Sequence, residues 1–291
     1  MKLSILIVNY NGKTYLGDCL RSIQRNILSE YEVIIVDNAS TDGSREYVRE
    51  HFPEVKLLVS DKNLGFAGGN NIGAREARGD YLLLLNNDTV LLNGINPAID
   101  LLENNKSIGI VGAMMLDGNK DYSLSAGNFP SPMRLIKITS VYKSSGYFKT
   151  GNFPQENQES GHIVNWVAGS FLLMPLSLWQ KLGGLDEGYF MYGEDVDFCR
   201  RALDAGYSTA YTPSVSYIHY CGFDPSRFPL ILKGYLRYHS KFSNVFSSAL
   251  AAGILISGLI ARVMVYGLLY INTRKSVYGV KTKACLASLK I

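Results

Sequence analysis

The sequence predicts an α/β fold in which helices flank a mostly parallel β-sheet, followed by a hydrophobic helical segment near the C-terminal end. Three observations lead to this prediction. Short apolar runs alternate with helix-patterned segments over residues 1–90, polar residues follow these runs directly, and a long apolar stretch lies late in the chain. Apolar runs that alternate with helices are typical of βαβ units, and hence of a parallel sheet covered on both faces.

Four strands are expected in this first part, because each run is continuous, apolar and short. They cover Leu3–Val8, Val33–Val36, Val55–Val59 and Tyr81–Leu85. The helices between them follow from apolar residues at helical spacing and from capping residues. They are a helix carrying Leu16, Leu20, Ile23 and Ile27 with Thr14 as its N-cap, and two more at about Ser44–Phe52 and Ala67–Arg78.

The second part of the chain is less regular. We expect strands at Ile108–Gly112, within Ile163–Met174 and at Val215–Ile218, a helix at Glu194–Ala205, and loops over residues 117–160. The last of these strands delivers His219.

Polar side chains follow the carboxyl ends of all four early strands. They are Asn9, Asp37, Asp61 and the triplet Asn86-Asn87-Asp88. In an open parallel sheet these strand ends share one edge, and ligands bind there. The sequence therefore predicts one crevice lined by residues that are far apart in the chain.

Charge and cysteine content limit the class of protein. The net charge is +4, but all 25 acidic residues lie at or before Asp224, and the charged side chains after it are all basic. Such a basic tail suggests nucleic acid or an anionic membrane surface, and its apolar neighbours favour the membrane. The four cysteines are scattered, which argues against a disulfide framework or a zinc site and fits a reducing compartment.

The apolar stretch Val245–Ile271 contains one charge, Arg262. A central arginine in a spanning helix costs roughly 2.5–3.5 kcal/mol on insertion scales. The segment therefore fits a spanning helix, a helix packed on the domain or on a second subunit, or a helix that lies in or dips into the bilayer. We favour the last, with Arg274–Lys290 against anionic headgroups.

Two familiar phosphate-binding signatures are absent, since the chain has no GxxxxGK[ST] and its glycines do not fit GxGxxG. The segment Asp37–Ser44 fits a capped turn and equally a carboxylate that binds a base imide or a ribose hydroxyl. The glycine-rich segment Asn63–Asn71 permits a tight turn, and it also permits close approach of backbone amides to a nucleotide, which is the better interpretation.

Three further features have both a structural and a chemical interpretation. Asn86-Asn87-Asp88 is either a plain turn or a weak site for a hard cation that a diphosphate helps to hold. Glu194-Asp195 begins a predicted helix, where acids favour the helix dipole, but one of the pair is also a candidate general base toward a sugar hydroxyl. His219 is a lone histidine, usually a structural residue, and is of interest as a partner of Asp88.

Taken together, seven strings in this order resemble glycosyltransferase family 2, especially its bacterial rhamnosyltransferase-like branch. They are SILIVNYNG (4–12), DNASTDGS (37–44), KNLGFAGGNN (62–71), LLLNNDTV (83–90), WVAGSFLL (166–173), YGEDVDFCRRA (192–202) and HYCG (219–222). The resemblance implies a GT-A fold and an inverting transfer of a sugar from a nucleoside diphosphate, with Mg²⁺ or Mn²⁺ as cofactor.

The resemblance also implies a role for each matching residue. Asn9 and Asp37 would contact the nucleoside, with Asn63, Gly65 and Asn70 nearby. Asp88 and His219 would bind the metal, and Asn86 stands where many members have a further acid, with Asn87 beside it. Asp195 would be the catalytic base, supported by Glu194, and Trp166 would line a sugar subsite, although a buried strand aromatic is nearly as good an interpretation.

We therefore expect a GT-A domain over residues 1–243, with a nucleotide-binding half (1–90) and a metal and acceptor half (91–243), and a membrane-associating or oligomerisation segment over residues 244–291. The expected function is transfer of a sugar from a dTDP- or UDP-sugar, with dTDP-L-rhamnose as a candidate, to a glycan or lipid-linked acceptor. This would take place at the cytoplasmic face of a bacterial membrane, without nucleic acid, in a monomer or homodimer. The alternatives are a non-catalytic membrane-attached sugar-binding module and a glycoside hydrolase, which also uses paired carboxylates.

Overall fold

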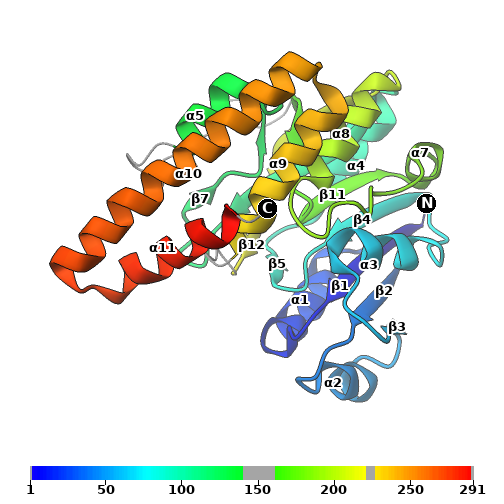
Figure 1. Cartoon of the computed structure of the whole chain (residues 1–291). Helices are drawn as coiled ribbons and strands as arrows, with labels where there is room; N and C mark the ends of the chain where they lie inside the picture. Colours follow the sequence, from blue (N-terminus) through cyan, green and yellow to red (C-terminus); the bar gives the residue numbers. More distant parts are fainter. Residues whose placement is uncertain (1, 140–160, 221–226, 290–291) are drawn as a thin grey trace. The chain divides into compact units, whose positions relative to one another are not determined.

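The computed structural model describes residues 2–139, 161–220 and 227–289 (Figure 1). These residues form two compact units. The first contains residues up to 128, 161–190 and 194–220, and the second contains residues 129–139, 191–193 and 227–289.

The first unit is built on one mixed sheet. Four strands, β1 (Leu3–Asn9), β2 (Tyr31–Asn38), β3 (Lys56–Ser60) and β4 (Tyr81–Leu85), are parallel to one another in the order β3-β2-β1-β4. This is the parallel sheet that the alternating apolar runs predict. It brings the carboxyl ends of β1, β2 and β4 to one edge.

Beyond β4 the sheet becomes mixed. It continues through β11 (Phe171–Pro175), β6 (Ile108–Leu116), β12 (Ser208–His219) and β5 (Thr89–Leu91). β11 is antiparallel to both of its neighbours, β12 is parallel to β6, and β5 is antiparallel to β12. The short strands β7 (Tyr122–Ser123) and β9 (His162–Val164) pair with β6 and β12, and β8 (Ala126–Gly127) pairs with β10 (Trp166–Val167) in a separate sheet.

Helices cover both faces of the parallel strands. On one face Leu3, Ile5 and Ile7 of β1 pack in the same core as α1 (Lys13–Asn26) and α4 (Asn96–Asn104). On the other face α3 (Gly65–Ala74) lies so close that a Cβ on Gly73 would come within 2.1 Å of Leu6. The remaining helices of this unit are α2 (Ser44–His51), α7 (Leu176–Leu182) and α8 (Glu194–Asp204).

Several local predictions differ from the structure. α1 begins at Lys13 after Gly12, without a side-chain cap, so the assignment of Thr14 as N-cap is wrong. The apolar stretch 163–174 is three strands, because a bend at Asn165 and a turn at Gly169 interrupt it. The strand expected at 215–218 is the end of the much longer β12, which continues past Pro213 with an irregular register. Of the loops expected over 117–160, residues 140–160 lie outside the described residues, and the others include β7, β8 and α5 (Pro132–Thr139).

The second unit is helical. α5, α9 (Phe228–Phe242) and α11 (Ser276–Ser288) all contact α10 (Val245–Thr273). Its core consists of Leu135, Phe228, Leu232, Ala251, Leu255, Leu259 and Cys285. Among the described residues α10 is the single helix that is long and apolar enough to cross a membrane. It begins at Val245, with Asn244 as N-cap. α9 packs in the same unit as α10, and the domain boundary between residues 243 and 244 stays a prediction.

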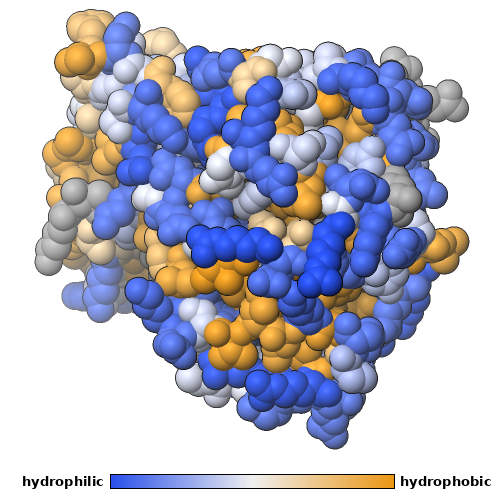
Figure 2. All heavy atoms as spheres, turned by 90° about the vertical axis from the view of Figure 1, so that its right-hand side faces the viewer, coloured by the Kyte–Doolittle hydropathy of each residue, from blue (hydrophilic) through white to orange (hydrophobic). Residues whose placement is uncertain are grey.

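Figure 2 shows one face of the molecule, coloured by hydropathy. Hydrophilic residues occupy much of this face, with smaller hydrophobic areas between them.

Candidate functional site

The ends of β1 and β2 are joined by a buried hydrogen-bond cluster around Asn9. Its side-chain amide donates to Asp37 (3.1 Å), Ser40 (3.1 Å) and Ser44 (2.9 Å). Asn9 and Asp37 are each only 1% exposed. The two predicted nucleoside-binding residues are thus brought together, but mainly into contact with the protein.

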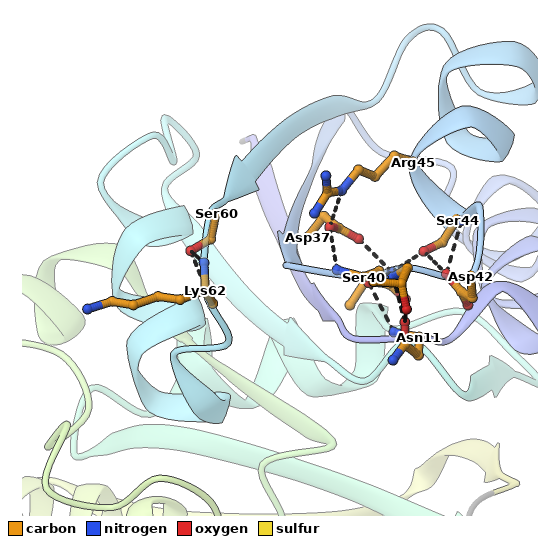
Figure 3. A network of polar contacts seen from close by, with 10 residues as sticks. Asn11, Asp37, Ser40, Asp42, Ser44, Arg45, Ser60 and Lys62 are labelled. Carbon is orange, nitrogen blue, oxygen red and sulfur yellow. Dashed lines mark hydrogen bonds and ion pairs between the residues drawn. The ribbon is translucent and has the colours of Figure 1, made fainter.

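Arg45 at the start of α2 reaches back to Asp37 (Figure 3). Its Nε donates to the carboxylate at 2.6 Å, and the Ser40 amide donates to the same oxygen at 3.0 Å. Burial alone would raise the pKa of Asp37, but the hydrogen bonds from Ser40 and Arg45 outweigh it and hold the pKa below its ordinary value of 3.8. Asp37 is therefore ionised at neutral pH. The sequence motif indicated Asp37 but not Arg45.

The loops after β1 and β2 also bond to each other (Figure 3). The Ser40 hydroxyl accepts from the Asn11 amide (3.0 Å), and the Asn11 side chain accepts from the Thr41 amide (2.8 Å). Asp42 accepts from the Lys13 amide (2.8 Å), which satisfies a donor at the start of α1. Asn11 has a φ of 52°, a conformation that asparagine tolerates better than most residues. These contacts fix both loops before any ligand binds.

The glycine-rich segment contacts protein backbone. Gly65 has a φ of +73°, and a Cβ there would lie 2.1 Å from the carbonyl oxygen of Phe190. Asn63 accepts from the Gly65 amide (2.9 Å), and Asn70 is buried and donates to the carbonyl of Phe66 (2.9 Å). The expected role of Asn70 beside a nucleotide is therefore indirect in this structure, because its side chain supports the first turns of α3.

Asn87 joins the triplet after β4 to the Asn9 cluster. Its amide donates to the side-chain oxygen of Asn9 at 2.7 Å. This approach requires Gly12, since a Cβ on Gly12 would lie 1.9 Å from the Asn87 amide nitrogen. Asn87 therefore links the Asn9–Asp37 cluster to the residues that follow β4.

Asp88 and His219 come together through strand pairing. β5 begins directly after Asp88, and its Thr89 is paired with His219 at the end of β12. The His219 Nε2 lies 3.1 Å from the Asp88 carboxylate and 3.2 Å from the side-chain amide of Asn86. Asp88 and His219, which the sequence analysis suggested as partners, thus lie together, and Asn86, 133 positions before His219, joins them.

This group fits part of a divalent-cation site. Two ligands that occupy adjacent positions of an octahedral ion at about 2.1 Å are roughly 3.0 Å apart, close to the separation of Asp88 and His219. Within the described ranges no three acidic, histidine or cysteine side chains cluster as a complete metal site. The residues present therefore suit a cation whose remaining ligands come from a diphosphate and water.

Asp195 differs from the other acids at the start of α8. Glu194 and Asp197 are buried, at 5% and 0% exposed, whereas Asp195 is partly exposed. Its carboxylate accepts from the Gly169 amide at 3.0 Å. Of the three, Asp195 therefore has the accessible carboxylate that a general base requires.

A short backbone segment connects Asp195 to the group formed by Asp88, His219 and Asn86. The backbone N–H of Gly169 donates to the carboxylate of Asp195. The carbonyl of the next residue, Ser170, accepts from the backbone N–H of Asn86 at 3.2 Å. Trp166 lies outside these contacts, in the β8–β10 sheet, where its indole donates to the carbonyl of Asn128 (3.0 Å). The structure thus brings Asp37, Asn9, Asn87, Asn86, Asp88, His219 and Asp195 into one chain of contacts, and leaves Trp166 beside it.

Sequence reasoning also missed a buried ion pair that holds α8. Arg201 donates to Asp197 at 2.6 Å and to the carbonyls of Leu182 (2.7 Å) and Gly184 (2.8 Å). The i,i+4 spacing of Asp197 and Arg201 was the available signal. This pair fixes the helix on which Glu194 and Asp195 are placed.

Comparison with known sequences agrees with this geometry. The model of glycosyl transferase family 2 matches residues 4–168, and that of glycosyl transferase family group 2 matches residues 148–287. A Mycobacterium tuberculosis N-acetylglucosaminyl-diphospho-decaprenol L-rhamnosyltransferase is 28% identical over 258 residues, covering 84% of this chain and 83% of the relative. The rhamnosyltransferase WbbL of Escherichia coli K12 is 29% identical over 233 residues, covering 77% and 85%.

Solved structures share the fold. A Pyrobaculum calidifontis mannosyltransferase in complex with GDP-mannose and Mn²⁺ has a TM-score of 0.55 at 15% identity, covering 98% of this chain and 85% of that one. GalNAc-T7 with UDP, GalNAc and Mn²⁺ has a TM-score of 0.60 at 16% identity, covering 77% of this chain but only 44% of that one. Because the family model matches and the fold is GT-A, the chain belongs to glycosyltransferase family 2 and is similar to its rhamnosyltransferase members.

Proposed function

We propose that this glycosyltransferase is inverting and metal-dependent, and that it moves rhamnose from dTDP-L-rhamnose to a hydroxyl of a glycan or lipid-linked acceptor in the synthesis of cell-wall or other cell-surface polysaccharide. The observation that carries the proposal is the connected group of Asp88, His219 and Asp195 in a chain whose relatives include named rhamnosyltransferases. The acceptor class follows the M. tuberculosis relative, whose name specifies a diphospho-decaprenol substrate.

In this proposal Asp195 accepts the proton of the acceptor hydroxyl, whose oxygen attacks the anomeric carbon opposite the leaving diphosphate. The Gly169 amide keeps one carboxylate oxygen oriented, and the buried Glu194 supports the start of α8. Asp88 and His219 would hold Mg²⁺ or Mn²⁺, with Asn86 beside them, and such a cation supplies charge neutralisation to the departing diphosphate.

The donor nucleoside would lie against the Asp37 side of the edge. Asp37 is already paired with Arg45, so Arg45 either contacts the base or ribose itself or moves aside when the donor binds. Asn9 orients Asp37 and Asn87 together, while Asn63, Gly65 and Asn70 fix the beginning of α3. Trp166 remains a proposal for a sugar subsite.

The proposed place of action is the cytoplasmic face of a bacterial membrane, with the segment 244–291 as the membrane-associating part. The support is the apolar helix α10 and the exclusively basic charge that follows Asp224. Association of two copies through the same segment is the competing use of this surface.

A donor panel tests the proposal most directly. dTDP-rhamnose, UDP-hexoses and GDP-mannose are compared for thermal stabilisation and slow donor hydrolysis, each with EDTA, Mg²⁺ or Mn²⁺. We expect dTDP-rhamnose to give the largest metal-dependent stabilisation, and Asp88→Asn to remove its metal-dependent part. A response that is equal with EDTA, or a clear preference for a UDP- or GDP-sugar, would reject the metal or the donor assignment respectively.

A further inference from the structure

α10 has two faces in different surroundings. Ala251, Leu255, Leu259 and Arg262 are buried, and their spacing of three or four places them on one face, in the core of the second unit. The opposite side carries a row of large exposed apolar residues, which we call the exposed stripe. It consists of Phe246, Leu250, Ile256, Ile260, Met264, Leu268 and Ile271.

The charge of Arg262 does not interrupt this stripe. Arg262 is 6% exposed, and its guanidinium lies 5.0 Å from the centre of the Phe228 ring in α9, a cation–π contact. The single charge between Asn244 and Arg274 therefore faces the protein. The exposed stripe from Phe246 to Ile271 extends over about 38 Å at roughly 1.5 Å per residue, with the exposed Ser257 as a small polar residue beside it.

The second unit also argues against α10 as a spanning helix. α11 packs back on α10, with Tyr278 stacked on Tyr266 at 6.4 Å and the Lys281 ammonium 5.4 Å from the centre of the Tyr266 ring. If α10 crossed the bilayer, Lys281 would either enter the hydrocarbon or cross it together with Arg274 and Lys275. Basic residues on the far side oppose the usual orientation, in which they stay in the cytoplasm.

The charges at the two ends of the exposed stripe indicate its partner. Lys241 lies just before α10, Arg274 and Lys275 follow it, and all three are exposed. A second copy docked through the stripe would bring cations against cations, whether the two helices ran parallel or antiparallel. An anionic lipid surface instead offers hydrocarbon to the stripe and phosphate groups to both ends.

We propose that α10 lies in the plane of an anionic membrane surface, with the exposed stripe in the upper acyl region and the basic residues at both ends against lipid phosphates. The proposal rests on the membrane association proposed above and specifies its geometry. The protein is then bound to one leaflet, and α10 does not cross the bilayer.

Vesicle binding tests the partner. The full chain is sedimented with phosphatidylcholine vesicles with and without phosphatidylglycerol, at low and high salt. We expect binding that requires the anionic lipid and weakens with salt, and a loss of about tenfold or more in Ile260→Glu and in Met264→Glu. Leu28→Glu is the matched control, because Leu28 is 92% exposed in the first unit and its change adds the same charge elsewhere.

Depth measurements test the orientation. Tryptophan is placed at Phe246, Ile260 or Ile271, and its quenching by lipids brominated at different depths is compared with that of the parent chain. An in-plane helix gives the same shallow depth at all three positions, whereas a spanning helix gives a deep centre and shallow ends and would overturn the proposal.

Two other results would also overturn it. One is unchanged vesicle binding in both glutamate variants. The other is a dimer in solution that the variants convert to monomer without effect on lipid binding. Stabilisation by a nucleoside diphosphate, measured on every variant, shows that the first unit is folded and separates failure of this proposal from failure of the proposed transferase function.

Discussion

The two sides of the candidate site are built differently. On the Asp37 side, polar side chains bond mainly to one another and to backbone amides of adjacent loops, and Asn9 at the centre is buried. On the Asp88 side, a carboxylate, an imidazole and a carboxamide converge, and the nearby Asp195 is partly exposed. The first arrangement holds the loops after β1 and β2 in place, while the second offers groups of the kind that bind cations and accept protons. Substitutions on the two sides should therefore fail in different ways.

The largest effect is expected for Asp195→Asn, because the amide keeps the shape of the carboxylate but accepts no proton. We expect kcat to fall by about 10²–10⁴-fold, with the melting temperature and metal-dependent donor binding close to those of the parent chain. Steady-state kinetics and thermal shift measure the two quantities. Asp204→Asn at the exposed end of the same helix is the control. Near-normal turnover in Asp195→Asn would remove this residue from the role of base.

An intermediate effect is expected for Asn9→Ala, on the other side. The change leaves Asp37, Ser40, Ser44 and Asn87 each without one hydrogen bond, and each unsatisfied buried group costs about 1–3 kcal/mol. We expect the free energy of unfolding to fall by roughly 3 kcal/mol and donor affinity to fall with it, as measured by urea denaturation and calorimetry. Asn26→Ala is the control, since it removes bonds to the Ser22 and Leu91 carbonyls away from the site. A stable variant with normal donor affinity would contradict the scaffold interpretation.

The smallest effect is expected for Arg45→Gln, because Arg45 is partly exposed and solvent screening weakens its pairing with Asp37. The folded-state pKa of Asp37 is lowered, so its stabilisation is present above the unfolded pKa near 3.8 and is lost as the pH falls through the lower folded value. The difference in unfolding free energy between the parent chain and Arg45→Gln should therefore be full at pH 7 and shrink in acid below about pH 4.

Arg49→Gln, in the last turn of the same helix, is the control for that series. A difference that stays constant into strong acid would show that the pair does not depend on ionised Asp37. The dTDP affinity of Arg45→Gln sharpens the comparison further. Unchanged affinity assigns Arg45 a positioning role toward Asp37, and a loss places the guanidinium at the nucleotide.

The sequence indicated β1, β2, β3 and β4 well, because a parallel strand buried on both faces leaves a continuous apolar run. It indicated strand character over residues 163–174, but not the bend at Asn165 and the turn at Gly169 that divide the segment into three strands. It also shortened β12, since Pro213 reads as a strand end although the chain continues past it to His219. Local pattern carries little information on such irregular pairing.

The candidate site divides in the same way. Asp88 and His219 were indicated because each follows an apolar run, and Asp195 because it belongs to a pair of acids at the start of a predicted helix, while the roles of all three came from the family resemblance. Arg45 was missed, since nothing in its spacing from Asp37 predicts that a side chain on the next helix folds back to it. The need for Gly12 was missed as well, because it arises from Asn87, which is remote in the sequence.

The adjacent residues Gly169 and Ser170 have a consequence for how this enzyme tolerates change. Through one N–H and the next C=O they anchor α8 and the loop after β4 to the same stretch of main chain. In the proposed function, these two adjacent residues of main chain therefore couple the position of the proposed base, Asp195, to that of the loop that carries the proposed cation site. An insertion or deletion between Gly169 and Ser170 would therefore shift the proposed base relative to the proposed cation site and lower turnover.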